Sequence, residues 1–129
     1  MGAVKPFDAG DVPEEIVRAA MTEPALRGRV ILSSRRRVPL YHDNECVGFV
    51  TPHKAQIDPG AWRAGPIFVL PGHRGHRHVE KFYASYADRA WVAFIPHNAM
   101  GSLKMHKSAG FTDWRRSKGG RWMRREAQV

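Results

Sequence analysis

The pattern of apolar and polar positions along the chain predicts strands that alternate with helices. Residues 66–70 and 91–95 are two short, continuously apolar runs, which are typical of buried strands. Residues 76–88 follow the first run, carry apolar side chains at helical spacing, and are predicted as an amphipathic helix. Residues 98–109 follow the second run and show a looser helical pattern that ends at Gly110-Phe111. The centre of the chain is therefore predicted as strand, helix, strand, helix.

The flanking segments extend this order into a mixed sheet. A short helix is predicted between Asp11 and Pro24, and residues 38–42 and 46–51 are predicted as a hairpin. The other expectations are a strand at 3–7, a strand or a connector at 28–34, a loop at 53–65, and a final hairpin from 111–116 and 121–125. This order predicts one α/β domain, residues 1–129, with a mixed, mostly antiparallel twisted sheet and helices on both faces.

The turn between the first apolar run and its helix, residues 71–77, is rich in glycine, arginine and histidine. A strand that feeds a helix through such a turn presents backbone N–H groups and a positive helix dipole to an anion. We therefore predict a phosphate site in which Arg74 supplies a cation, Gly75 an amide, and His76 and His78 further amides. The alternative is a solvated turn that only starts a helix.

The histidines His73, His76 and His78 also suggest a metal cluster. Their spacing spreads them around the start of the helix, and no nearby cysteine or well-placed carboxylate completes a ligand set. We therefore expect no metal here, and expect these histidines to face solvent or phosphate.

The chain has 21 Lys and Arg against 12 Asp and Glu, a formal net charge of +9. Such an excess predicts attraction to a polyanion, although an arginine-rich solvated surface alone gives the same number. The cations gather at residues 35–37 and again from Arg115 to Arg125. Only Trp114 and Trp122 are interleaved with the second group, which is too few aromatic residues to predict a base-stacking platform.

Bulk composition excludes several classes of protein. Apolar residues make up 43% of the chain, which fits a folded domain and not a disordered one. No apolar run approaches the roughly 18 residues of a membrane span, and the first ten residues contain no apolar signal region. Cys46 is the only cysteine, so an internal disulfide is excluded and a reducing, cytoplasmic location is expected.

Two motifs occur at a characteristic separation. Leu70 and Pro71 precede residues 74–79, Arg-Gly-His-Arg-His-Val, which open a helix. Further on, a second helix has Asn98 at its start and Gly110-Phe111 at its end, and a two-strand hairpin follows. Together these features resemble the GCN5-related N-acetyltransferase (GNAT) superfamily, in which the first motif is Arg-x-x-Gly-x-Gly/Ala. The resemblance covers most of the chain and implies the GNAT fold. The small size and the altered phosphate motif are similar to phage-encoded members.

The resemblance implies a binding site for acetyl-CoA or another acyl-CoA. The residues that match the pyrophosphate motif are Arg74, Gly75, His76, Arg77 and His78. It also implies that the strands at 66–70 and 91–95 splay apart, so that backbone amides of Val69 and Leu70 bind the pantetheine and the acyl carbonyl. Arg77 and Val79 replace small residues of the family motif. The Arg77 side chain either crowds the pyrophosphate or supplies charge to it.

The resemblance also implies which residues would transfer protons during the reaction. His106 occupies the position where relatives often place a tyrosine that protonates the departing thiolate, and Ser102 is its runner-up. A solvated helix face is the alternative for His106. Asn98 is predicted to cap its helix and to contact the cofactor. For a general base we name His97, with His53, Asp58 and a water chain as open alternatives.

These features predict an N-acyltransferase that transfers an acyl group from acyl-CoA to a nucleophilic nitrogen. The basic surface suggests an anionic macromolecular acceptor: a modified DNA base, another nucleic acid or an acidic protein. The main alternative is a catalytically silent GNAT-like module that binds nucleic acid or a protein, and a plain nucleic-acid-binding domain is a third. We expect a monomer or a homodimer without membrane association.

Overall fold

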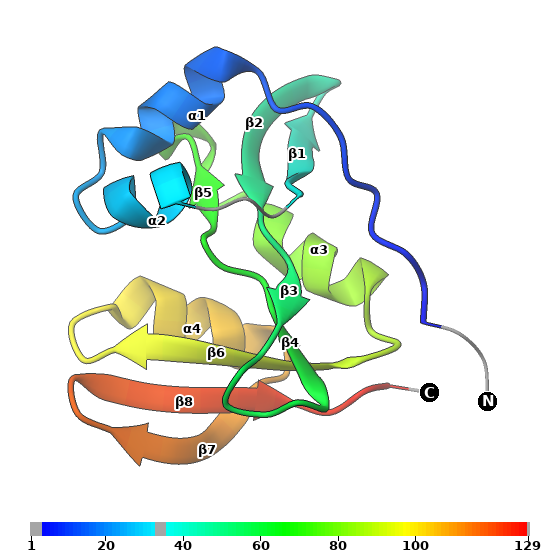
Figure 1. The fold of residues 1–129 in the computed structure, drawn as a ribbon, viewed down its shortest axis with the longest axis vertical. Coiled ribbons are helices and arrows are strands. Elements are labelled where there is room, and N and C mark those ends of the chain that lie inside the picture. The colour runs from blue at the N-terminus through cyan, green and yellow to red at the C-terminus, as the bar shows by residue number, and fades with distance from the viewer. Residues whose placement is uncertain (1–3, 33–35, 129) are drawn as a thin grey trace. The chain divides into compact units, whose positions relative to one another are not determined.

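The computed structural model describes residues 4–32 and 36–128, which form two compact units (Figure 1). Unit 1 comprises Met1–Lys5, Lys54–Arg63 and Glu80–Val129, and unit 2 comprises Pro6–His53 and Ala64–Val79. The chain thus passes between the units four times, and neither unit is a continuous stretch of sequence. No helix among the described residues is long and apolar enough to cross a bilayer.

Unit 2 contains a three-stranded antiparallel sheet in the order β1-β2-β5. Strands β1 (Val38–His42) and β2 (Glu45–Val50) form the predicted hairpin, and β5 (Phe68–Val69) pairs with β2. Asp43 and Asn44 make the turn with φ of 49° and 68°, which is the left-handed geometry that two-residue hairpin turns require. Asn and Asp tolerate this geometry better than other non-glycine residues, so the sequence itself fixes the register.

Two short helices complete unit 2: α1 (Glu14–Met21) and α2 (Arg27–Leu32). Glu14 and Glu15 lie in the first turn of α1, where the helix dipole favours acidic side chains. The buried cluster of this unit joins both helices to β2 and β5 and consists of Ile16, Ala20, Leu26, Val30, Phe49 and Phe68. Burial of this apolar face supplies the stability that helices of this length lack in isolation.

Gly48 is required where β2 meets β5. A Cβ atom at this position would lie 2.1 Å from the Phe68 carbonyl oxygen. The two backbones therefore approach more closely than any side chain allows, and glycine is the residue that permits such an approach.

Unit 1 contains most of a five-stranded sheet in the order β3-β4-β6-β8-β7. Strands β4 (Ala61–Arg63) and β6 (Ala90–Pro96) run parallel, whereas β6, β8 (Gly120–Arg125) and β7 (Thr112–Ser117) pair antiparallel. β3 (His53–Lys54) is at the opposite edge from β7 and crosses the boundary between the units. The pairing of β7 with β8 shifts register between Asp113 and Arg115, which leaves Trp114 as a bulged residue.

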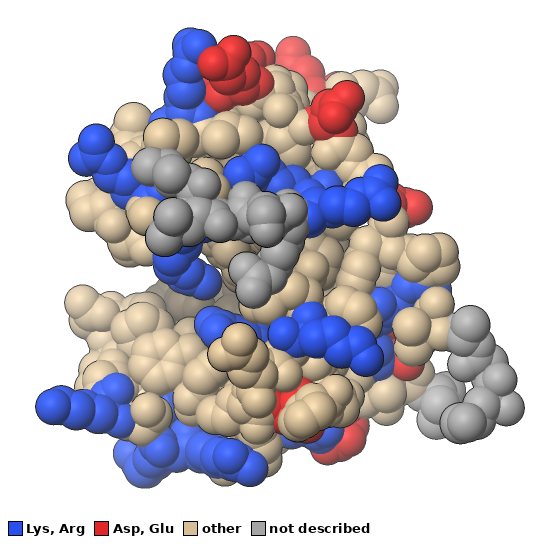
Figure 2. Space-filling model, viewed as in Figure 1, with Lys and Arg blue, Asp and Glu red and all other residues tan. Residues whose placement is uncertain are grey.

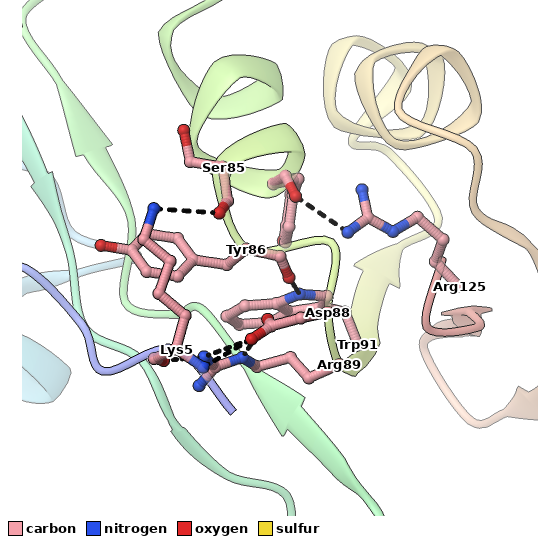
Figure 3. Close-up of polar contacts among 8 residues, drawn as sticks. Lys5, Ser85, Tyr86, Asp88, Arg89, Trp91 and Arg125 are labelled. Atoms are coloured by element: carbon pink, nitrogen blue, oxygen red, sulfur yellow. Dashed lines mark hydrogen bonds and ion pairs between the residues drawn. The ribbon is translucent and has the colours of Figure 1, made fainter. Parts of the chain in front are cut away.

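Helix α3 (His78–Ser85) packs aromatic side chains against one face of this sheet, and helix α4 (Met100–Ser108) contacts α3 through His106 and Tyr83. Trp91 is fully buried, with ring centroids 5.5 Å from Phe82 and 5.3 Å from Tyr83. Carbonyls near the end of α3 accept hydrogen bonds from side chains of distant segments (Figure 3). Arg125 donates to Tyr83 (2.9 Å), Trp91 to Tyr86 (2.9 Å) and Lys5 to Ser85 (3.4 Å). These contacts supply the partners that a helix C-terminus lacks.

The predicted α/β class is confirmed, with mostly antiparallel pairing and both hairpins in place. The sheet is in two pieces, because β5 pairs with β2 and β6 with β4 and β8. The predicted strand at 3–7 is wrong: residues 4–7 form neither helix nor strand, and Ala3 lies outside the described residues. Residues 28–32 belong to helix α2 rather than to a strand or connector, while 33 and 34 lie outside the described residues. The predicted loop at 53–65 contains β3 and β4.

Helix α2 was missed because Val30-Ile31-Leu32 is a continuous apolar run, which is also typical of a strand. Helical spacing is shown only by Leu26 and Val30. These residues are four apart, both buried, and flanked by arginines that stay exposed. Four-residue spacing is the helical repeat, but two positions are too few to be distinguished from a strand.

Candidate functional site

The turn between β5 and α3 has the backbone geometry of an anion-binding loop. A short 3₁₀ turn, Pro71–His73, leads into Gly75 with φ of 93° and Arg77 with φ of 62°. Left-handed residues interspersed with ordinary ones direct successive N–H groups toward one side, and the first amides of α3 follow directly. Among the described residues the amides of Gly75 and His76 donate no hydrogen bond, so they remain available to an anion.

The two departures from the expected motif have different consequences. Arg77 adopts the left-handed conformation that suits glycine, at a cost of about 1–2 kcal/mol for a residue with a Cβ, and it is exposed. The Val79 side chain is buried, with 8% of its surface exposed, and is therefore part of the packed interior of the protein. Thus the side chain of Arg77 is at the surface of the turn, and that of Val79 is inside the protein.

Arg74 has partners within the protein. Its guanidinium forms an ion pair with Glu23 and donates from Nε to the Val69 carbonyl oxygen at 2.9 Å. The group also lies over the Phe68 ring, 5.9 Å from the centroid. Half of the Arg74 side chain is exposed. The predicted role as a phosphate ligand therefore requires the Glu23 ion pair to open or to be shared with the anion.

Four histidine rings lie together beside this turn. His42, at the end of β1, has ring centroids 5.2 Å from His73, 4.7 Å from His76 and 5.3 Å from His78. His78 is buried, and the buried Nδ1 of His73 has no hydrogen-bond partner within the described residues. No three His, Cys, Asp or Glu side chains of the described segments are arranged to hold a metal ion. His42 comes from a distant strand, so no local spacing in the sequence could have placed it in this group.

The backbone of β5 offers one of the two predicted amides. The Leu70 amide donates to the Val47 carbonyl oxygen at 2.8 Å and is thereby used in the sheet. Because successive peptide groups of a strand point to opposite edges, the Val69 amide points away from β2. That edge of the β1-β2-β5 sheet carries no further strand among the described residues. Val69 is therefore available to a ligand, whereas Leu70 is not.

The proposed acid His106 is in the interior of unit 1. It is 3% exposed, and its ring lies among Tyr83 and Phe111, with centroids 5.7 and 5.0 Å away. Nδ1 is 2.7 Å from the Ser102 carbonyl oxygen, which accepts only, so Nδ1 carries a proton. Nε2 then accepts from the Tyr83 hydroxyl at 3.3 Å.

Burial is the main cause of the shifted pKa values of His106 and Tyr83. It lowers the pKa of His106 from its ordinary value and raises the pKa of the Tyr83 hydroxyl. Both groups are therefore neutral at pH 7. Ser102 is half-buried, and its hydroxyl oxygen is 3.3 Å from Nδ1 of His106, so the structure brings these two predicted residues together. Tyr83 was predicted only as part of a buried helix face, and its link to His106 spans 23 residues.

The remaining candidates lie apart from this cluster. Asn98 and His97 are exposed in the connection between β6 and α4. Helix α4 begins at Met100 with Ala99 at the N-cap position and no side-chain cap, so the predicted capping role of Asn98 is wrong. Asp58 accepts from Arg124 at 2.9 Å, and this hydrogen bond lowers the pKa of its carboxyl, which makes it a weak base. His53 is half-buried, with Nδ1 2.9 Å from the Thr51 carbonyl oxygen.

The predicted site residues therefore form two groups. The turn and β5, with Arg74, Gly75 and Arg77, belong to unit 2, and Ser102, His106 and His97 belong to unit 1. Glu23 and His42 join the first group and Tyr83 joins the second, all through contacts between residues distant in sequence.

No protein-family profile and no curated protein matches this sequence. Solved structures do match its fold. An acetyltransferase from Agrobacterium tumefaciens str. C58 has a TM-score of 0.66 at 12% identity, covering 98% of this chain and 95% of that one. An acetyltransferase from Thermus thermophilus has a TM-score of 0.65 at 14% identity, covering 95% of this chain and 98% of that one.

A GNAT family acetyltransferase from Elizabethkingia anophelis, solved with acetyl-CoA bound, has a TM-score of 0.59 at 15% identity, covering 96% of this chain and 97% of that one. Identities this low establish the architecture alone. The chain has the α/β fold of the GNAT acetyltransferases.

Proposed function

We propose that the protein is an acyl-CoA-dependent N-acyltransferase that acetylates an amine. The observation that carries the proposal is the turn at residues 74–79. It combines left-handed backbone at Gly75 and Arg77 with the amides of Gly75 and His76, which donate no hydrogen bond among the described residues. Strained backbone at a non-glycine residue persists where the surrounding structure holds it in place, and such sites are often functional.

The residues of the turn fit the diphosphate of coenzyme A. A Cβ added at Gly75 would meet no atom within 4 Å, so the side of the turn at this residue is open. The amides of Gly75 and His76 and the positive charges of Arg74 and Arg77 would hold the anion. The edge amide of Val69 would orient the pantetheine or polarise the acyl carbonyl. When bound, acetyl-CoA supplies a thioester whose acyl group passes to an amine nitrogen, with the amine proton finally carried by the released thiol.

Ser102 and His106 are the proposed proton-handling residues. In the resting protein His106 holds its proton on Nδ1 against the Ser102 carbonyl. Its burial disfavours the imidazolium, so His106 would donate a proton only when transiently charged or through the Ser102 hydroxyl. Exposed His97 is the proposed base toward the attacking amine.

The experiment compares two glycines of the same turn. Acetyl-CoA at a hundred times its dissociation constant should stabilise the native protein by about 2.7 kcal/mol, measured by thermal shift and checked by native mass spectrometry for a coenzyme A adduct. Gly75→Ala strains a residue at φ of 93° and should weaken this stabilisation at least tenfold in apparent affinity. Gly72→Ala is the matched control, because its Cβ meets nothing within 4 Å and its φ is not left-handed.

A second candidate function is a silent GNAT-like module that binds nucleic acid or a protein. The engagement of Arg74 by Glu23 and Val69 favours it, because the expected phosphate ligand is already occupied. Arg77→Gly separates the candidates, since it restores the glycine of the family motif without touching that ion pair. Absence of any acetyl-CoA effect on the wild type, with a gain in Arg77→Gly, would assign the chain to the silent class.

A further inference from the structure

One face of the unit 1 sheet bears a row of aromatic and arginine side chains. Cross-strand partners share a face of a sheet, and Phe94 of β6, Trp122 of β8 and Arg115 of β7 are partners in register. Phe94 and Trp122 are 5.4 Å apart between ring centroids, and both are half-buried. Arg63 of β4 lies over the Trp122 ring at 4.9 Å.

Trp114 extends this row at the bulge of β7. It packs beside Trp122 against the small buried cluster of Ala55, Ala61, Ala90 and Val92, which places it on the same face. The Arg115 guanidinium stacks on it at 4.0 Å from the ring centroid. We name the set Arg63, Phe94, Trp114, Arg115 and Trp122 the aromatic–arginine face. The opposite face holds Trp91 and Arg125, which contact α3.

A groove of about 710 Å³ adjoins the aromatic–arginine face, between the loop at 57–59, strand β7 and the C-terminal segment. Trp114 and Arg115 line it, as does Arg124. Its carboxylates already have arginine partners: Arg124 for Asp58 and Glu126, and Arg121 for Asp113. The negative charge of these carboxylates is therefore offset by the paired arginines, which reduces their repulsion of an incoming anion.

Arg115 of this groove and two further cations of the β7–β8 hairpin have no ion pair among the described residues. Arg115, Arg116 and Lys118 are exposed and form no ion pair in the part of the chain that the structure describes. Lys and Arg side chains gather over the region of the β7–β8 hairpin in the space-filling view (Figure 2). The surface thus combines a cationic rim, a groove and half-buried aromatic rings on a sheet, which is the combination that single-stranded nucleic acids require.

We propose that the aromatic–arginine face binds single-stranded nucleic acid, with unstacked bases on Trp122 and Trp114 and the phosphates along Arg115 and Lys118. Two aromatic residues were too few to predict such a platform from the sequence, and Phe94 and Arg63 complete it in the structure. The surface lies within unit 1, so the proposal stands without the acyltransferase assignment. If both hold, it names the acceptor class of that reaction.

The test uses fluorescence anisotropy of a labelled 20-nucleotide deoxythymidine strand with the full chain and no acetyl-CoA. Binding should weaken steeply as salt rises, and tryptophan emission should change on binding. Trp122→Leu should weaken the affinity about 5- to 150-fold, the effect of losing one stacked base. Trp62→Leu is the control. Trp62 is also half-buried and next to cations, but it lies on the sheet face opposite to the aromatic–arginine face.

A second pair of variants keeps the test independent of folding effects. Arg115→Gln and Arg116→Gln each remove one exposed charge from neighbouring positions of β7, on opposite faces of the sheet. Arg115→Gln should reduce affinity at least threefold more than Arg116→Gln. Three results would overturn the proposal: no binding at 50 mM salt, equal affinity for heparin or duplex DNA with no effect of Trp122→Leu, or tighter binding to poly-glutamate, which would indicate an acidic protein partner.

Discussion

Unit 1 holds thirteen Lys and Arg residues against five Asp and Glu, whereas unit 2 holds eight against seven. Nearly all of the formal charge of +9 therefore belongs to unit 1. The interiors differ as well: unit 2 packs mainly aliphatic side chains around Phe49 and Phe68, and unit 1 packs aromatic rings around Trp91. We therefore expect a polyanion to be attracted to unit 1, while the turn proposed for a compact diphosphate lies in unit 2.

The comparison predicts two kinds of anion recognition within one small chain. The proposed recognition at the turn 74–79 would depend on backbone amides and conformation, because Arg74 is paired with Glu23. The proposed recognition at the aromatic–arginine face would depend on side-chain charge and stacking. Substitutions that alter charge should therefore affect unit 1 binding, and substitutions that alter backbone freedom should affect unit 2.

The largest expected effect on the free energy of unfolding comes from removing a buried aromatic ring from either unit. Trp91→Ala in unit 1 and Phe49→Ala in unit 2 remove fully buried rings, and each should lower the free energy of unfolding by about 3–5 kcal/mol. Because the chain crosses four times between the units, we expect both variants to lose hydrogen-exchange protection in both units together. Met100→Ala, at a residue 66% exposed, is the control. Loss of protection confined to one unit would show that the units unfold separately.

Alanine substitutions at two glycines of unit 2 should change the free energy of unfolding by smaller amounts and in opposite directions. Gly48→Ala places a Cβ against the Phe68 carbonyl and should destabilise by about 3 kcal/mol. Gly28→Ala, in helix α2 with open space around its Cβ, should stabilise by about 0.5–1 kcal/mol. Urea unfolding of both variants checks this. A tolerated Gly48→Ala would mean that β5 is not paired with β2 in this register.

The smallest effect concerns the pH dependence of unit 1. Burial lowers the pKa of His106 below the ordinary value of 6.5, so the unfolded chain binds more protons than the folded one as the pH falls below that value. The contribution of neutral His106 to stability is complete above pH 6.5 and is lost progressively below it. His106→Gln should flatten this part of the profile, measured by urea unfolding at about pH 7.5, 6.5 and 5.5. His97→Gln, at an exposed residue, should leave the profile unchanged.

The sequence was most reliable where a local pattern determines the structure. The hairpin at Asp43-Asn44 follows from residues that accept left-handed geometry, and β6 from a run that is apolar at every position. It failed where local signals were weak or ambiguous: the apolar run Val30-Ile31-Leu32 of α2 also fits a strand, and β4 is three residues long. For the candidate site the sequence located the turn and helix α4, but assigned Leu70 and Arg74 without their partners Val47 and Glu23.

The succession of strands and helices and the position of the turn before α3 could be predicted from the chain alone, because each depends on neighbouring residues. The basic character follows from the count of charged residues. Only the tertiary structure decided that His106 is buried against Tyr83, that His42 joins three histidines of the turn, and that Phe94, Trp122 and Arg115 align across three strands. These contacts join segments far apart in sequence, and their pairing is fixed by sheet register and core packing, which no single segment encodes.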